Sequence, residues 1–228
     1  MRSVAPAALA AAALVLALAA PAFGAELTVP RTCYAEGDRI PVDGRGFTPS
    51  GKVRLSLERA DGTVLEATDD PVAEPDGSVS GGYGVDNETG WFDRTQSRFQ
   101  MTMRLVDQTD TSITASTSFI FSRWSVGVRT VGGRIHPSRP VSLNPVGYTT
   151  AIGKPLYGHW MRNGRRAHTR RLGVLRGPCG DLRTRLKRGF PFRPVLPGRY
   201  EVRFSTSRTN TRREAIGVRA ATVARRIP

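Results

Sequence analysis

The chain has 228 residues and a formal net charge of +15, but it contains only two cysteines and three histidines. These residues do not stand at the paired spacings that zinc ligands need. The sequence also lacks a phosphate-binding loop and a grouped nucleophile, histidine and carboxylate. The composition therefore predicts no metal, no cofactor and no catalytic residue.

The first 24 residues, MRSVAPAALAAAALVLALAAPAFG, have the pattern of a secretory signal peptide. One basic residue, Arg2, precedes an apolar run rich in alanine and leucine, and the small residues Ala22 and Gly24 flank Phe23. The run is too short and too rich in alanine for a stable membrane span. We expect cleavage between Gly24 and Ala25 and a secreted chain with neither a lipid anchor nor a transmembrane span.

Charge divides the rest of the chain into two halves. Residues from Glu26 to Arg123 include 10 basic and 16 acidic side chains, whereas residues from Trp124 to Pro228 include 23 basic and 3 acidic ones. The 204 residues that remain after cleavage suffice for one large domain or two small ones, each with its own core. The difference in charge predicts two domains, an acidic one at 26–123 and a strongly basic one at 124–228.

Alternation of apolar and polar residues is the main local pattern, and helical spacing is almost absent. Residues 53–57 and 98–105 each place apolar side chains at every second position, which gives a strand one buried and one wet face. The segment 112–121 is typical of a further strand, and Ser122 to Trp124 form a short junction. The pattern predicts an all-β protein.

An internal repeat relates the two halves. The segments 44–67 and 144–169 share a Gly-aromatic-Thr element, a Gly-Lys strand start and a glycine-containing hairpin turn. The matching positions are Gly46 and Gly147, Phe47 and Tyr148, and Lys52 and Lys154. A repeat of about one domain length predicts two similar sandwiches in tandem.

Residues 40–64, IPVDGRGFTPSGKVRLSLERADGTV, contain a Gly-x-Gly-Phe-Thr-Pro corner before a strand. This segment resembles the early strands of bacterial secreted immunoglobulin-like domains of the TIG-like and neocarzinostatin-like groups. The segments 153–164 and 172–182 are similar to uncharacterised secreted bacterial proteins. The resemblance implies two tandem immunoglobulin-like antiparallel β-sandwiches after an N-terminal signal helix.

The two cysteines, Cys33 and Cys179, are expected to pair or to remain separate thiols. Two cysteines in an exported protein are interpreted first as a possible disulfide, and a bond between these two would join the two domains. An intermolecular link is a further alternative. A nucleophilic role for Cys179 lacks support, because the second half offers few carboxylates to orient a base.

Two hairpin registers are compatible with the histidines. If Asn163 and Gly164 form a two-residue loop, His159 lies opposite His168, which would make a candidate metal clip. The matching turn in the first half, RADGT, favours a three-residue loop that pairs Leu57 with Leu65. Carried over by the repeat, that register places Ala167 opposite His159 and removes the clip.

The arginines of the second half are the most unusual feature of the sequence. In DLRTRLKR, three basic side chains share one face of the expected strand and stand roughly 7 Å apart. Three further bases lie on the preceding hairpin. The candidate anion-binding residues are Arg183, Arg185, Lys187, Arg166, Arg170 and Arg171.

A polyanion is the natural partner for such a surface, whether an anionic cell-wall polymer, a polysaccharide, a phospholipid surface or a nucleic acid. The alternative is that the basic domain docks the acidic one, in a structural or protein-protein adhesion module. A small-ligand carrier and a hydrolase are the remaining alternatives. The sequence favours an exported, non-enzymatic binding or structural protein.

Trp91 and Phe92, in the loop segment GWFD, form a candidate aromatic contact. They have no alternating partners and are expected at the domain interface or in an exposed contact patch.

Overall fold

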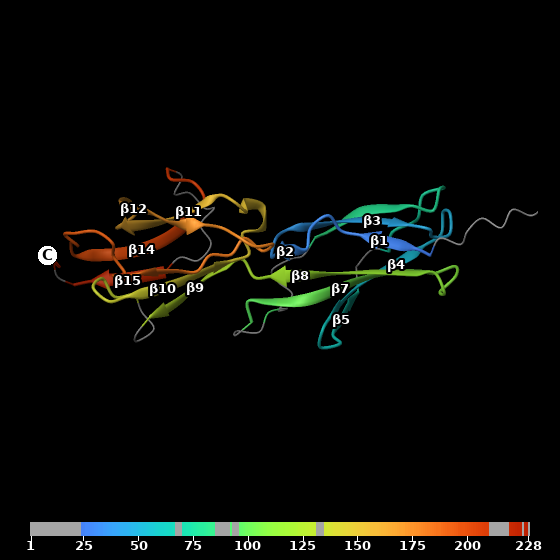
Figure 1. The fold of residues 1–228 in the computed structure, drawn as a ribbon, viewed down its shortest axis with the longest axis horizontal. Coiled ribbons are helices and arrows are strands. Elements are labelled where there is room, and N and C mark those ends of the chain that lie inside the picture. The colour runs from blue at the N-terminus through green and yellow to red at the C-terminus, as the bar shows by residue number, and fades with distance from the viewer. Residues whose placement is uncertain are drawn as a thin grey trace, which may run out of the picture.

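A computed structural model describes residues 24–66, 70–84, 92, 96–130, 135–209, 219–224 and 226–227. The expected signal helix falls in residues 1–23 and lies outside the described residues. The molecule is elongated, and its strands form two β-sandwiches placed end to end (Figure 1). The all-β prediction is confirmed.

Strands β1 to β8 form the first sandwich. They are β1 (Glu26–Thr28), β2 (Cys33–Ala35), β3 (Arg39–Arg45), β4 (Val53–Arg59), β5 (Val64–Glu66), β6 (Val79–Gly84), β7 (Arg98–Asp107) and β8 (Thr114–Ser122). One sheet has the order β1-β3-β6 and the other has the order β2-β8-β7-β4-β5.

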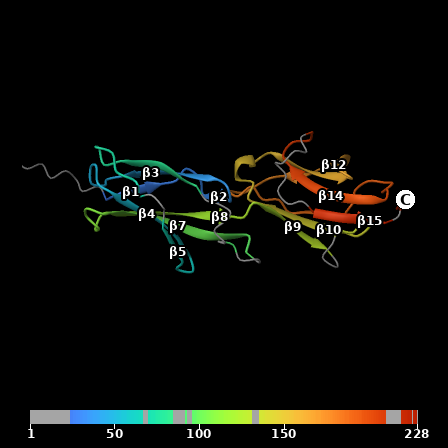
Figure 2. The ribbon, with the colours of Figure 1, turned by 180° about the vertical axis from the view of Figure 1, so that it is seen from behind.

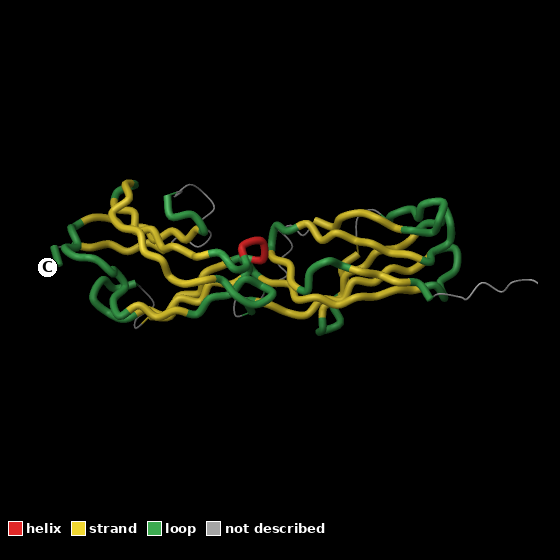
Figure 3. Tube along the Cα trace, turned by 45° about the horizontal axis from the view of Figure 1, so that its top comes forward, coloured by secondary structure: helices red, strands yellow, loops and turns green. Residues whose placement is uncertain are grey.

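The second sandwich contains the remaining strands and one short 3₁₀ helix. They are β9 (Ser125–Thr130), β10 (Val141–Val146), η2 (Thr149–Ala151), β11 (Pro155–Arg162), β12 (Arg165–Val174), β13 (Thr184–Leu186), β14 (Gly198–Ser205) and β15 (Arg219–Val223). Its sheets have the orders β13-β10-β9 and β12-β11-β14-β15. The same division is visible from behind (Figure 2), and η2 lies in the middle of the molecule, between the sandwiches (Figure 3).

Alternation along the strands produces two separate hydrophobic cores. In β4, Val53, Leu55 and Leu57 are buried, and Met101, Met103 and Leu105 of β7 lie against them. The second core is drawn from residues after the junction, with Trp160 as its largest fully buried side chain. The buried residues of β4 and β7 thus lie on the inward face of their sheet, as a period of two requires.

One pair of strands departs from the expected antiparallel arrangement. β2 runs parallel to β8, with Cys33 beside Ile120 and Ala35 beside Ser122. The amide of Glu36 continues this pairing, because it donates to the carbonyl of Ser122. β2 therefore ends next to the residues that lead into the second sandwich.

The repeated glycine corner has the same backbone geometry in both sandwiches. Gly46 has φ +82° and Gly147 has φ +80°, a region that favours glycine. A Cβ atom at Gly147 would also collide with the carbonyl oxygen of Arg123. Glycine at this corner thus permits the backbone of the second sandwich to approach the end of the first.

The two hairpin turns differ, although the repeat relates them. In the first sandwich Gly62 is left-handed and Leu57 opposes Leu65, as expected from a three-residue loop. In the second sandwich Arg162 opposes Arg165, so Asn163 and Gly164 form a two-residue loop in which both φ angles are positive.

Both predicted positions of His159 are wrong. A β-bulge follows the turn, and Ala167 is the extra residue, so Trp160 opposes His168 and His159 opposes Thr169. The two-residue register would have placed His159 opposite His168, and the three-residue register opposite Ala167. A bulge changes the count of residues on one strand, and no feature of the turn itself signals it.

Candidate anion-binding surface

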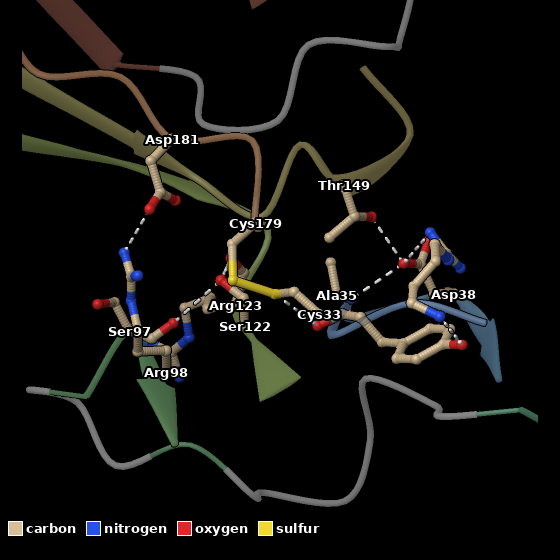
Figure 4. Close-up of a disulfide and its surroundings, with 12 residues drawn as sticks. Cys33, Ala35, Asp38, Ser97, Arg98, Ser122, Arg123, Thr149, Cys179 and Asp181 are labelled. Atoms are coloured by element: carbon tan, nitrogen blue, oxygen red, sulfur yellow. Dashed lines mark hydrogen bonds and ion pairs between the residues drawn. A yellow bond between two sulfur atoms is a disulfide. The ribbon is translucent and has the colours of Figure 1, made fainter. Parts of the chain in front are cut away.

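A disulfide joins Cys33 of the first sandwich to Cys179 of the second, across 146 residues of chain (Figure 4). The two Cα atoms are 5.3 Å apart, and both residues are almost completely buried. The predicted pairing is confirmed. Cys179 is therefore a structural residue, because a sulfur engaged in a buried disulfide offers no thiolate for catalysis.

Polar contacts surround the disulfide at this junction. The Thr149 hydroxyl, from η2, donates to Oδ2 of Asp38 at 2.7 Å, and the same oxygen accepts from the amide of Ala35 at 3.0 Å. The amide of Trp124 donates to a carboxylate oxygen of Glu36 at 3.1 Å. Figure 4 shows the Asp38 contacts on one side of the disulfide and the Arg98–Asp181 ion pair on the other. Polar contacts therefore stabilise the junction on both sides of the disulfide.

The ion pair across the junction has a polarity opposite to that expected from the overall charges. Arg98, in the acidic half, contacts Asp181, in the basic half, at 2.8 Å. Charge-driven docking of the two halves would pair acids of the first with bases of the second. Among the described residues, none of the six candidate bases named from the sequence makes an ion pair.

The outer side of the sheet β13-β10-β9 carries three arginines. Ser142 of β10 opposes Arg129 on β9 and Arg185 on β13, so these three residues form one row across the sheet. Adjacent strands lie about 4.8 Å apart, which places the two arginines about 10 Å apart with the small serine between them. Arg183 lies two residues before Arg185 and points to the same side.

These three arginines define what we call the basic face: Arg129, Arg183 and Arg185. All three are exposed, and together with Ser142 and Asn144 they line a hollow of about 410 Å³. The surface is hollow here because the side chains of Ser142 and Asn144 are much shorter than those of the surrounding arginines. The hollow can thus admit an oxyanion that accepts hydrogen bonds from two guanidinium groups at once.

The expected strand at DLRTRLKR is shorter than predicted, but its alternation holds. Only Thr184 to Leu186 pair as β13, while Leu186 is buried and Arg183, Arg185 and Lys187 are exposed. Lys187 lies just beyond the end of the strand. Sequence reasoning missed Arg129, because only the pairing of β9, β10 and β13 brings it beside Arg185.

The other three candidate arginines belong to a different sheet. Arg166, Arg170 and Arg171 are exposed on β12, an edge strand of the sheet β12-β11-β14-β15. Arg166 donates to the carbonyl of Thr209 at 3.4 Å. The structure therefore does not place these three residues in the row formed by the basic face.

His159 and His168 have structural surroundings. His159 is fully buried, and its ring nitrogens contact the hydroxyl of Thr169 at 2.9 Å, the hydroxyl of Ser205 at 3.1 Å and the carbonyl of Ser207 at 3.1 Å. Burial lowers the pKa of His159, and the charge of Arg166 lowers it further. The described residues contain no group of three histidine, cysteine, aspartate or glutamate side chains placed to hold a metal ion.

Of the predicted aromatic pair, only Phe92 can be placed, since Trp91 lies outside the described residues. Phe92 stacks on Phe121, with ring centroids 5.3 Å apart, and packs against the first core. Arg123 lies over its ring at 5.0 Å and donates to its carbonyl oxygen. Phe92 is thus partly buried against the first core, beside Arg123 of the junction.

A cavity of about 240 Å³ lies between the sandwiches, lined by residues that include Asp38, Trp124, Tyr148 and Lys154. Burial raises the pKa of the Tyr148 hydroxyl, which has no hydrogen-bond partner among the described residues. The space is smaller than the roughly 300–1,000 Å³ of ordinary ligand pockets. It gives little support to a small-ligand carrier.

None of the helices in the described part of the chain is long and apolar enough to span a membrane.

No protein-family model and no curated protein matches the sequence. Solved structures similar to the chain include a tetra-tandem repeat from the extending region of a large adhesion protein, at 16% identity and a TM-score of 0.29, covering 88% of this chain and 49% of that one. A mutant Salmonella alpha-2-macroglobulin has 16% identity and a TM-score of 0.31, covering 91% and 15% respectively. Red sea bream transglutaminase has 11% identity and a TM-score of 0.32, covering 88% and 31%.

The chain thus spans about half or less of each of these proteins, and TM-scores this low carry no argument about function. The class of the protein follows from its own strands and surface. It is an all-β protein of two disulfide-linked sandwiches, one of which carries a row of exposed arginines.

Proposed function

We propose that this chain is an exported, non-enzymatic binding protein whose second sandwich holds an anionic polymer of the cell envelope. The two sandwiches correspond in this proposal to immunoglobulin-like domains at residues 26–123 and 124–228. The basic face makes the contact with the polymer. The first sandwich, covalently fixed to the second, sets the position of the basic face relative to the rest of the molecule.

The observation that carries the proposal is the combination of exposure and missing partners on the basic face. Arg129, Arg183 and Arg185 are exposed, and none of them makes an ion pair with a described carboxylate. Sets of arginines without internal partners produce a positive field that attracts polyanions. Their spacing along and across the sheet allows repeated anionic groups to be bound in series.

The rival function is a structural or adhesion module in which charge docks the two halves. The contacts at the junction favour the binding function over this rival. A disulfide, hydrogen bonds from uncharged donors of the second half to the Asp38 and Glu36 carboxylates, and one ion pair of opposite polarity hold the sandwiches together. The arginines of the basic face take no part in these contacts, so their charge has no described role inside the molecule.

The experiment compares two charge-matched variants of the full chain on immobilised poly(glycerol phosphate). The test variant is R129S/R183S/R185S, and the control is R171S/R176S/R199S, which removes three exposed arginines outside the basic face. If the chain binds through phosphates, the logarithm of the binding constant should fall linearly with the logarithm of the salt concentration. We expect the test variant to lose about 2 units of that slope while the control keeps most of it.

Equal slopes for the test and control variants would contradict the assignment to the basic face. Absence of binding by the wild-type chain at low salt would contradict the proposed function altogether and favour the structural rival. Unfolding temperatures of both variants close to that of the wild type would show that neither result stems from misfolding.

A further inference from the structure

A second basic hollow lies at the end of the second sandwich that is farthest from the junction. β11 starts beside Lys154 near the junction and ends at Arg162, so the β11–β12 turn occupies the far tip together with Ile227 (Figure 1). The hollow has a volume of about 720 Å³. We call it the tip groove, and its main lining residues are Arg162, Arg165, Arg166, His168, Phe192 and Arg193.

The tip groove has a rigid aromatic wall. His168 stacks on Phe192 with ring centroids 4.9 Å apart, and Phe190 stacks on Phe192 at 5.7 Å. Tyr200, which is buried, lies edge-on to Phe190 at 4.7 Å, and its hydroxyl donates to the carbonyl of Leu196. Because these rings pack on one another, the shape of the groove is fixed before any ligand binds.

The rim of the tip groove is positively charged. Among the described residues, none that lines the groove is an aspartate or glutamate, and Arg162, Arg165 and Arg193 make no ion pair. Arg166 has only the carbonyl of Thr209 as a described partner. Guanidinium groups around a concave surface with an apolar wall hold an oxyanion more strongly than the same groups on a flat surface.

A continuous run of exposed bases joins the basic face to the tip groove. The chain leaves β13 and reaches the groove at Phe192 and Arg193 within seven residues. The bases along this path are all exposed: Arg183, Arg185, Lys187, Arg188 and Arg193. A linear polyanion that follows this segment from the basic face to the tip would therefore meet five exposed bases and no acidic side chain of the segment.

We propose that the tip groove is a second binding site for phosphate groups, and that one phosphodiester polymer chain occupies the groove and the basic face together. This inference rests on the proposed function, which it extends from one site to two. A linear polymer fits better than an isolated anion because two basic hollows are connected by exposed bases. A long chain should gain from the second contact, since the second binding event is intramolecular.

The length of chain needed follows from strand geometry. β11 runs from the junction to the tip, and its eight residues span about 27 Å. The distance from the basic face to the tip is therefore at most about this length. Even at the spacing of about 3.4 Å that phosphates have along one strand of B-DNA, about ten phosphates span roughly 31 Å and can bridge the sites, whereas about two phosphates are too short to do so.

Calorimetry of the full chain with these two poly(glycerol phosphate) lengths tests the proposal. The wild type should bind two short chains per molecule but only one long chain. Its affinity for the long chain should be at least about 100-fold higher than its affinity for a short chain. The tip variant R162S/R165S/R193S should bind one short chain and lose most of the advantage of the long one. The control R171S/R176S/R199S should resemble the wild type.

A direct readout places the ligand in the groove. The ring resonances of His168 should move when the short chain binds, in the wild type and in R129S/R183S/R185S but not in the tip variant.

The possible failures are distinguishable. If the tip variant binds both chain lengths as the wild type does, the tip groove is not a phosphate site, while the basic face stands. If the tip substitutions abolish binding and the basic-face substitutions do not, the groove stands and the proposed function of the basic face fails. If polyglutamate competes at the groove as well as phosphate chains do, the site recognises acidic peptides, and the phosphate assignment is wrong.

Discussion

The two sandwiches use their charged residues differently. In the first, aspartates hold the backbone in place: Asp38, Asp61, Asp76 and Asp110 each accept a hydrogen bond from a backbone amide two or three residues away. Asp107, which is fully buried, accepts from the amides of Thr48, Thr109 and Asp110. In the second, the bases of the basic face and tip groove point into solvent.

The comparison separates charge that builds structure from charge that remains available to a partner. The acidic excess of the first sandwich is partly used up in turns and loops, where carboxylates satisfy backbone donors. The basic excess of the second sandwich has no equivalent use among the described residues, apart from Arg203 with Glu201 and the bond from Arg166 to the carbonyl of Thr209. Net charge alone would not have distinguished these two cases.

The largest expected effect comes from removing the covalent link that makes the two sandwiches one unit. In the variant C33S/C179S, the free energy of unfolding should fall by up to about 5 kcal/mol, because the open chain gains the entropy that a closed loop of 146 residues denies it. Urea unfolding without reductant measures this loss. Reduced wild-type protein should match the variant, and a loss below about 1 kcal/mol would show that the link contributes little.

A smaller effect should separate the structural acid from the available base. D107N should reduce the free energy of unfolding by about 2 kcal/mol, because three backbone amides lose a charged acceptor. R185S, which removes an exposed side chain, should stay within about 0.5 kcal/mol of the wild type. Urea unfolding of both variants measures these changes in the free energy of unfolding. Equal losses in D107N and R185S would contradict the distinction between structural acids and available bases.

The acid-stability profile should also differ between wild type and D107N. Burial alone would raise the pKa of Asp107, but the amides of Thr48, Asp110 and Thr109 outweigh it and lower the pKa to about 2. The stability that the ionised carboxylate gives is thus present above pH 3.8 and lost as pH falls toward 2. D107N should lack this part of the acid transition, and an unchanged profile would contradict the assignment.

The smallest effect concerns His159 in the second sandwich. Because its pKa in the folded protein lies below 6.5, the unfolded chain takes up the proton first as pH falls. Its contribution to stability is therefore complete above about pH 6.5 and declines below it. H159Q should flatten this decline, with the remainder owing to His168, whose pKa burial also lowers.

Much of the fold was predictable because a period of two is a local property. The alternation in β4, β7 and β13 fixes which side chains are buried, and the left-handed turn at Gly62 fixes the pairing of Leu57 with Leu65. The pairing of Cys33 with Cys179 was one of several alternatives from the sequence, since only the parallel placement of β2 beside β8 brings Cys33 to the junction.

The features that could not be predicted depend on register and on contacts between distant segments. The bulge at Ala167 moves His159 to a position opposite Thr169, and neither turn type indicates it. Arg129 lies beside Arg185 only because β9 and β13 both pair with β10, and no local pattern in the sequence indicates that pairing. The alternation in the sequence thus indicated that Arg183 and Arg185 are exposed on one side, but it gave no sign of Arg129 beside them.

The disulfide also determines how the molecule responds to pulling. The first sandwich lies at one end of the long axis, and the C-terminal end of the chain lies at the other (Figure 1), so tension between the two ends of the molecule runs through the junction. Because the disulfide joins Cys33 directly to Cys179, it bears the tension in place of the chain between these two residues. Residues 34–178, including β3 to β12, cannot be drawn out while the bond is intact. Under load only the two outer segments can extend, and the two sandwiches stay connected.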